Sequence, residues 1–220
     1  MNERKQKLQQ VLKRACETDN TYAIQQLIHK GANIHEDLGK KETFVHIAAT
    51  HGSVNAIRCL YDNGADVDVL IDHYSPEGYG RYALAPYTPL EYAIDYGQCD
   101  VILALHDCQV NVKKYIKSGT ENMKLHNYAL HCLSSDKLSD TLHSLFLSGL
   151  DLNEKYKDGK SLVHTITISK TFKEVEKLRL LTRLLDANVD FNSTDNEGHT
   201  PLFYASEYDV INFLEQQKNE

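Results

Sequence analysis

The sequence predicts an all-α solenoid of stacked antiparallel helix pairs with finger-like hairpin loops. One observation is a short opening motif that recurs at residues 43, 88, 128, 161 and 200 of the 220-residue chain. A second is that apolar residues follow at helical spacing in two short runs split by a polar break. A third is the modest apolar share of 41%, which suits an elongated core better than a spherical one. Because a short helix pair cannot bury its apolar face alone, neighbouring pairs are expected to stack.

The first helix pairs are read from the spacing of apolar residues between Leu8 and Ile28 and between Phe44 and Leu60. Later helix starts carry a different signal. Pro89 and Pro201 stand where the first helical residue belongs, because the first turn of a helix has no use for the missing N–H. Thr88 and Thr200 precede these prolines and are predicted to be the N-caps.

Residues 43–68 read TFVHIAATHGSVNAIRCLYDNGADVD, which resembles the ankyrin repeat almost position for position. The opening T-P-L-H-x-A-A-x-x-G of that family recurs in degenerate form at Thr88-Pro89-Leu90-Glu91, Tyr128-Ala129-Leu130-His131, Ser161-Leu162-Val163-His164 and Thr200-Pro201-Leu202-Phe203. The resemblance covers essentially the whole chain. It implies a single domain over residues 1–220 with six units: 1–35 as an N-terminal cap, 36–68, 69–113, 114–153, 154–192, and 193–220 as a C-terminal cap.

The intervals between openings are 45, 40, 33 and 39 residues, against an ankyrin period of ~33, so the excess must leave the stack as loops. The largest excess lies between Asp68 and Thr88, where prolines and glycines forbid a regular helix. Aromatic residues and arginine are enriched at binding hot spots. The candidate partner-binding residues of this finger are Tyr74, Tyr79, Arg81, Tyr82 and Tyr87. The alternative is a tolerated surface insertion whose aromatic side chains fold back onto neighbouring helices.

The eighth and ninth positions of each ankyrin opening face the concave groove in this family. Here the resemblance places a mostly acidic and aromatic set of residues there, and the further candidate partner-binding residues are His51, Asp95, Tyr96, Asp136 and Tyr208. Such a surface suits a protein partner with basic residues and an apolar anchor. Exposed polar residues that bind nothing are the plain alternative at each of these sites.

Charge and composition exclude several classes of partner. Lys and Arg number 24 against 31 Asp and Glu, and the net charge of −7 argues against a nucleic-acid binder. No stretch reaches the ~18 apolar residues needed to span a bilayer, and the charged start argues against a signal peptide, so we expect no membrane insertion. Five irregularly spaced cysteines are expected to be free thiols of a cytoplasmic, monomeric protein.

Metal and cofactor chemistry are not expected. The 11 histidines and five cysteines include no C-x-x-C or H-E-x-x-H pattern. The ankyrin resemblance gives His46, His131 and His164 a structural role in bonding neighbouring turns. Gly159-Lys160-Ser161 resembles the end of a phosphate-binding loop, but Glu154 stands where that motif needs glycine. We therefore interpret this segment as a hairpin turn before a helix.

Two functions are compatible with this pattern. The first is a non-catalytic module that binds a protein through its concave face and the Tyr-rich finger. The alternative is an enzyme with a small site in the 69–96 insertion, which would use His73, Asp72 or Arg81 with Asp95, although no motif supplies a nucleophile. The degenerate repeats also resemble, in style, the ankyrin proteins that intracellular bacteria secrete into host cells, as well as divergent eukaryotic or viral members of the family. The first of these likenesses predicts an effector acting in the host cytosol.

Overall fold

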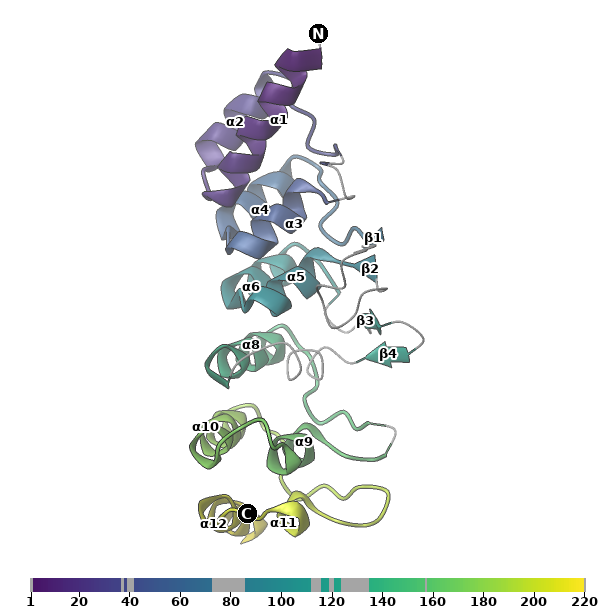
Figure 1. Cartoon of the computed structure of the whole chain (residues 1–220), viewed down its shortest axis with the longest axis vertical. Coiled ribbons are helices and arrows are strands. Elements are labelled where there is room, and N and C mark those ends of the chain that lie inside the picture. Colours follow the sequence, from purple (N-terminus) through teal and green to yellow (C-terminus); the bar gives the residue numbers. More distant parts are fainter. Residues whose placement is uncertain are drawn as a thin grey trace. The chain divides into compact units, whose positions relative to one another are not determined.

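The computed structural model describes residues 2–36, 38, 42–72, 86–111, 116–118, 121–123, 135–156 and 158–219. The chain forms two compact units, Met1–Cys132 and Leu133–Glu220. Both are built from short antiparallel helices, so the predicted all-α class is confirmed (Figure 1). The expectation of one continuous domain over residues 1–220 stays a prediction.

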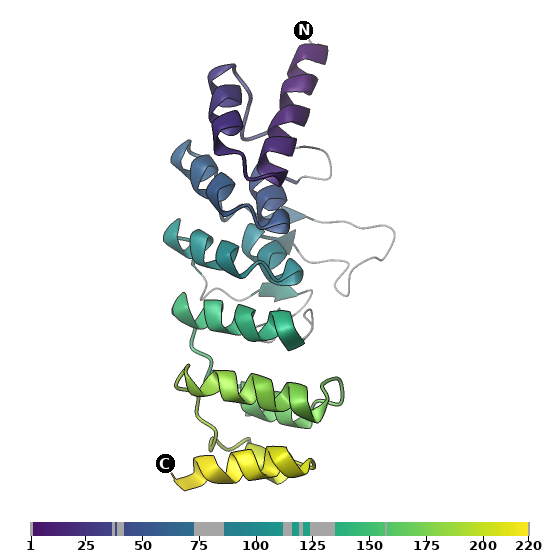
Figure 2. The same ribbon diagram turned by 90° about the vertical axis from the view of Figure 1, so that its left-hand side faces the viewer.

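The N-terminal unit contains three successive helix pairs. Its helices are α1 (Asn2–Glu17), α2 (Thr21–His29), α3 (Phe44–His51), α4 (Val54–Asp62), α5 (Pro89–Tyr96) and α6 (Cys99–Asp107). The first helices of the pairs form one layer, in which α3 contacts both α1 and α5, and the second helices form another, in which α4 contacts α2 and α6 (Figure 2). Phe44, Ile57, Leu60, Ile94 and Leu105 are fully buried between the layers.

Two pairs of short antiparallel strands follow the helices of this unit, one at the ends of the Tyr-rich insertion and one after α6. Strand β1 (Ile71–Asp72) pairs with β2 (Pro86–Tyr87), and β3 (Ile116–Ser118) pairs with β4 (Glu121–Met123). The β1–β2 pair brings the two ends of the Tyr-rich insertion together immediately before α5 (Figure 1). Residues 73–85, between these strands, lie outside the described part of the chain.

The C-terminal unit contains α8 (Ser135–Leu147), α9 (Leu162–Ile168), α10 (Glu174–Leu185), α11 (Pro201–Tyr204) and α12 (Tyr208–Gln216), followed by a 3₁₀ turn at Gln217–Asn219. Helices α8, α10 and α12 lie side by side in one layer, and α9 packs against α11 in the other (Figure 2). The third opening, Tyr128–His131, falls outside the described residues. Helix α10 has 12 residues, against nine in α12, so part of the excess length of this repeat lies in its second helix.

The two proline-marked helix starts differ in their capping. The side-chain hydroxyl of Thr88 accepts a hydrogen bond from the backbone N–H of Glu91, whose carboxylate accepts one from the N–H of Thr88 in return. This reciprocal pair is a capping box and confirms the predicted N-cap. Thr200 occupies the N-cap position of α11, but its side chain makes no capping hydrogen bond. The last opening is therefore held by other contacts, described below.

Candidate binding surfaces

His51, Asp95 and Tyr96 lie at corresponding positions at the ends of the neighbouring helices α3 and α5. Both helices end at a left-handed glycine, and the side-chain amide of Gln98 donates to the carbonyl of Thr50 at 2.9 Å, which ties the two helix ends together. His51 is exposed, Asp95 is half-buried, and the side chain of Tyr96 is 49% exposed. The structure thus brings these three predicted residues together on one surface of the N-terminal unit.

Tyr96 is supported from beneath by other rings. It stacks on Tyr92 with ring centroids 6.5 Å apart, and Tyr92 meets the buried ring of His46 edge-on at 5.2 Å. Tyr92 is itself buried, and its hydroxyl donates to a carboxylate oxygen of Glu42 at 3.3 Å. An exposed aromatic ring on such a fixed base loses little conformational freedom when it binds, which favours its use as an anchor.

The carboxyl group of Glu91 is buried at the base of the Tyr-rich finger. Only 3% of this residue is exposed, and its repeat position is the one that histidine occupies in the second, fourth and fifth units. Burial raises the pKa of Glu91 to about 7, the hydrogen bonds from Thr88 oppose that rise, and the nearby carboxylates of Asp95 and Asp68 add to it. The Tyr-rich finger is therefore followed, in the first turn of α5, by a carboxyl group that changes charge near neutral pH.

We expect Glu91→Gln to remove a pH dependence from the stability of the chain. A carboxyl pKa raised on folding means that the folded state binds more protons than the unfolded one between about pH 4.3 and pH 7. The contribution of Glu91 is thus most favourable below the unfolded pKa and is lost as pH rises through about 7. Glutamine keeps the acceptor for the Thr88 N–H without the buried charge. Urea titrations at pH 5 and pH 8 measure the free energy of unfolding. The difference between Glu91→Gln and the wild type should shift by about 2 kcal/mol in favour of the variant from pH 5 to pH 8.

The exposed Glu3→Gln substitution is the matched control and should leave both titrations unchanged. Equal pH dependence in Glu91→Gln and the wild type would contradict the buried, titrating carboxyl.

The remaining finger residues are placed only in part. Tyr74, Tyr79, Arg81 and Tyr82 lie outside the described residues, as does the His73 of the enzyme alternative. The backbone of Tyr87 lies in β2, opposite Ile71. Asp136 lies in the first turn of α8, the second helix of its repeat. The binding roles of all these residues stay predictions.

In the C-terminal unit, Tyr208 begins α12 and is 75% exposed. The preceding residue, Glu207, accepts a hydrogen bond from the ammonium of Lys177 at 2.7 Å. The same ammonium donates to the carbonyl of Thr167, near the end of α9, at 2.7 Å. Lys177 is only 2% exposed, and its proximity lowers the pKa of Glu207. This ion pair fixes the helix start that carries Tyr208 against α9 and α10.

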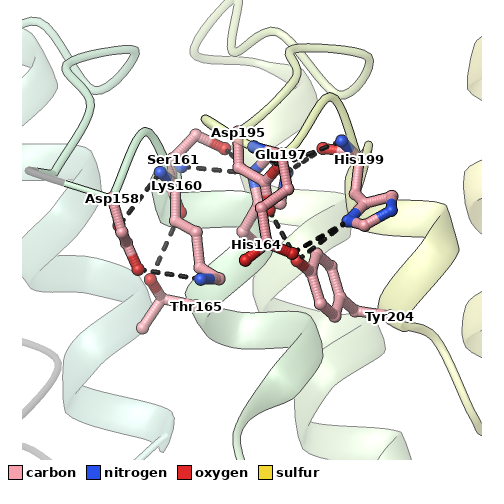
Figure 3. A network of polar contacts seen from close by, with 9 residues as sticks. All are labelled: Asp158, Lys160, Ser161, His164, Thr165, Asp195, Glu197, His199 and Tyr204. Atoms are coloured by element: carbon pink, nitrogen blue, oxygen red, sulfur yellow. Dashed lines mark hydrogen bonds and ion pairs between the residues drawn. The ribbon is translucent and has the colours of Figure 1, made fainter.

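The hairpin loops of the C-terminal unit contain a dense polar network around Asp195 (Figure 3). One carboxylate oxygen of Asp195 accepts the backbone N–H groups of Glu197 and His199, both at 2.9 Å, and the other accepts the hydroxyl of Tyr204 at 2.6 Å. These bonds, with the Tyr204 hydroxyl contributing most, lower the pKa of Asp195 to about 2. The carboxylate therefore stays charged and holds the turn before α11 in place of a Thr200 cap.

Ser161 and His164 have the spacing of a nucleophile and a base but no access for a substrate. The backbone N–H of Ser161 donates to Nδ1 of His164, so this nitrogen is an acceptor and the ring proton is on Nε2. The Ser161 hydroxyl, 2.9 Å from Nδ1, therefore also donates to it. Nε2 donates to the carbonyl of His199 at 3.0 Å (Figure 3). Ser161 and His164 are 1% and 0% exposed. This pair links one repeat to the next, as predicted for His164.

His46 makes the equivalent local contact in the N-terminal unit, with Nδ1 2.9 Å from the hydroxyl of Thr43 and the ring fully buried. The third predicted structural histidine, His131, lies outside the described residues. Within the described ranges, no cluster of three or more His, Cys, Asp or Glu side chains is arranged to hold a metal ion. Among the helices of those same ranges, none is long and apolar enough to cross a membrane.

Several features of these surfaces cannot be predicted from the sequence. Tyr92 belongs to the tyrosine-rich stretch 74–96, but the ring support that it gives to Tyr96 depends on neighbouring helices. Lys177 has the sequence context of an ordinary helix residue, and nothing in the sequence places it under Glu207. Phe203 stands at the histidine position of the last opening, is 63% exposed and stacks on His199 at 3.7 Å. The phenylalanine in place of histidine is the signal in the sequence that the last repeat is held by different contacts.

Comparison with known proteins identifies the repeat. Residues 12–114 match a family model described as "Ankyrin repeats (3 copies)". No curated protein sequence matches the chain significantly.

Solved structures share the fold at low sequence identity. The ankyrin repeat domain of Bcl-3, a member of the IkappaB protein family, aligns with a TM-score of 0.61 and 21% identity, covering 93% of this chain and 81% of that one. An ankyrin repeat domain from Acinetobacter baumannii AYE gives 0.61 and 18%, covering 94% and 97%. A chain in the complex of the Bdellovibrio bacteriovorus predatory endopeptidase Bd0816 with the immunity protein Bd3460 gives 0.59 and 16%, covering 94% and 97%. The predicted ankyrin fold is thereby confirmed.

Proposed function

We propose that this chain, which has the ankyrin fold and matches a family model of ankyrin repeats over residues 12–114, is a non-catalytic module that binds a protein partner. The proposed surface combines the concave face at His51, Asp95 and Tyr96 with the Tyr-rich insertion, whose ends pair as β1 and β2. Ankyrin repeat domains generally serve as protein interaction modules, and one of the similar structures is a complex of two proteins. The family thus supports the class of function, and the surface is argued from this chain's own residues.

The observation that carries the proposal is the exposed ring of Tyr96 on its fixed base. Tyr96 stacks on the buried Tyr92 and lies at the end of α5, which the Gln98–Thr50 hydrogen bond ties to the end of α3. Rigid aromatic side chains supply large contact area at small entropic cost, which is why they concentrate at binding hot spots. The adjacent carboxylate of Asp95 and the net charge of −7 favour a partner with Lys or Arg beside an apolar anchor.

The test is affinity capture from cell lysate with the wild type and with the triple variant Tyr79→Ala, Tyr82→Ala and Tyr96→Ala. We expect the captured partner to bind the triple variant at least about tenfold more weakly, because the variant lacks the proposed anchors. Tyr22→Ala is the matched control, since Tyr22 is 72% exposed but lies on α2, in the other helix layer. Binding of the triple variant within twofold of the wild type, with the fold intact by circular dichroism, would contradict the proposed surface.

The proposed setting is the cytoplasm, or the cytosol of a host cell if the protein is a secreted bacterial effector. The irregular repeat intervals of 45, 40, 33 and 39 residues support the likeness to effectors. Detection of the protein in the host cytosol only when the secretion machinery is intact would support this role. Strict retention in the bacterium would exclude it.

A further inference from the structure

A polar groove lies between helices α2 and α4 of the N-terminal unit, which pack against each other in the layer of second helices (Figure 1). Its volume of about 280 Å³ is just below the ~300–1,000 Å³ of pockets that hold a whole small molecule, so it suits one long side chain. Tyr96 is on α5, in the layer of first helices, and takes no part in this groove. The polar lining comes from Thr21 and Gln25 on α2 and from Asn55, Arg58, Asp62 and Asn63 on α4 and its C-cap.

The two asparagine side chains of the groove use their N–H groups within the protein. Nδ2 of Asn55 donates to a carboxylate oxygen of Asp19 at 2.8 Å, and Nδ2 of Asn63 donates to the carbonyl of Cys59 at 2.8 Å. Within the described ranges, no donor reaches the Oδ1 oxygen of either amide. These oxygens are thus available to a ligand that donates hydrogen bonds.

Asp62 supplies the groove with a carboxylate that has no counter-charge. It is the last residue of α4, where the helix dipole disfavours a negative charge. Arg58, one turn earlier, pairs instead with Asp107 on α6, with 2.8 Å between the guanidinium and the carboxylate. In the part of the chain that the structure describes, Asp62 forms no ion pair and its side chain forms no hydrogen bond. Since the charges of Arg58 and Asp107 cancel, Asp62 leaves the groove with one net negative charge.

The spacing of these groups matches an extended lysine side chain. Asn55 and Asp62 are two turns apart on one helix, so the groove runs about 10 Å along α4. Thr21 lies at the Asn55 end, because Asp19, two residues before it, holds the Asn55 amide. An ammonium is compact and carries three donors on a flexible stem, so it can reach a carboxylate and an amide oxygen together, whereas a guanidinium favours a planar bidentate partner.

We propose that this groove binds the side chain of a lysine on a protein partner. The ammonium donates to the carboxylate of Asp62 and to Oδ1 of Asn63, the alkyl stem lies along α4, and the backbone N–H of the lysine meets the acceptors at the Asn55 end. The bound cation also offsets the unfavourable charge at the end of α4. This inference rests on the proposed function for the source of the lysine, and it assigns the partner a contact separate from Tyr96.

The test is a titration of the isotope-labelled full chain with Nα-acetyl-lysine methylamide at low ionic strength, followed by the backbone amide signals in nuclear magnetic resonance spectra. We expect saturable shifts in α2 and α4. Asp62→Asn should weaken binding of this probe about tenfold, because a hydrogen bond between two charged groups is lost. The variant should fold normally, since it removes a carboxylate that the helix end disfavours.

Asp100→Asn is the matched control, because Asp100 is exposed on α6 and outside the groove, and it should change the dissociation constant by less than about twofold. The same probe acetylated on Nε has no charge and should not bind. The lysine site would be overturned by a lack of saturable shifts in α2 and α4, by equal affinity for the two probes, or by undiminished binding to Asp62→Asn. Any of these results would leave the proposed function and its Tyr96 surface standing.

The source of the lysine is tested with the captured partner itself. A partner captured by the wild-type chain should bind Asp62→Asn about tenfold more weakly and Asp100→Asn as tightly as the wild type. Equal affinity for Asp62→Asn and the wild type would overturn a partner lysine as the occupant of the groove.

Discussion

Gly159→Ala is expected to lower the free energy of unfolding by about 3 kcal/mol. Gly159 has a φ of +78°, a left-handed conformation that costs other residues strain. An added Cβ would also lie 2.5 Å from the backbone nitrogen of Asn196, which donates to the Asp158 carbonyl at 3.1 Å. The methyl group would push apart the two hairpins that this hydrogen bond joins.

The matched control is Gly198→Ala. Gly198 has nearly the same φ, +82°, but no atom lies within 4 Å of the position that an added Cβ would take, so only the backbone strain of about 1 kcal/mol applies. Urea unfolding followed by circular dichroism measures both variants. Equal destabilisation by the two substitutions would show that the approach of the hairpins at Gly159 contributes nothing. The same result would remove the close packing on which the hairpin interpretation of Gly159-Lys160-Ser161 depends.

The Lys177–Glu207 pair should respond unequally to loss of its two partners. Glu207→Ala leaves the ammonium of Lys177, 2% exposed, with the Thr167 carbonyl but no counter-charge, and we expect a cost of about 3 kcal/mol. Lys177→Met fills a similar volume, and the side chain of Glu207, 27% exposed, can take up water, so the expected cost is about 1 kcal/mol. Urea titrations of both variants at pH 7 give the comparison.

Arg183→Met is the control for the loss of a cation from the same helix. Arg183 pairs with Asp140 at 3.5 Å, but both side chains are at least half exposed, and such pairs contribute little. Its expected cost is below about 0.5 kcal/mol. A larger cost for Lys177→Met than for Glu207→Ala would mean that the lysine stem, rather than the buried charge, dominates the energetics of this site.

Helix starts show where local sequence is a sufficient guide and where it is not. Thr88 and Glu91 form a capping box because both partners lie within one helical turn, so the sequence contains the whole interaction. Thr200 carries the same local signal, but Asp195 and the backbone of the next hairpin residues hold that turn instead. The proline at the first helical position predicts both helix starts correctly, since its effect is confined to its own backbone.

The candidate sites divide in the same way. The repeat register predicts that His51, Asp95 and Tyr96 face the concave groove. They lie in the last turns of α3 and α5, because each repeat folds with the same local pattern, and their facing the groove stays a prediction. The support of Tyr96 by Tyr92 and the burial of Lys177 involve contacts between repeats, which no single repeat encodes. The binding role of the residues between β1 and β2 stays a prediction. Their insertion interrupts the repeat register, from which the positions of the other residues are predicted.

By itself, the sequence determined the all-α stack of helix pairs, the positions of its inserted fingers and the structural role of His46 and His164. These depend on periodicity and on contacts that every repeat makes in the same way. Only the tertiary structure decided that Glu91 is a buried carboxyl with a pKa of about 7, and that Lys177 is buried and paired with Glu207. Burial and charge pairing are set by the neighbouring repeat, and one repeat's sequence does not specify the side chains that the next will place against it.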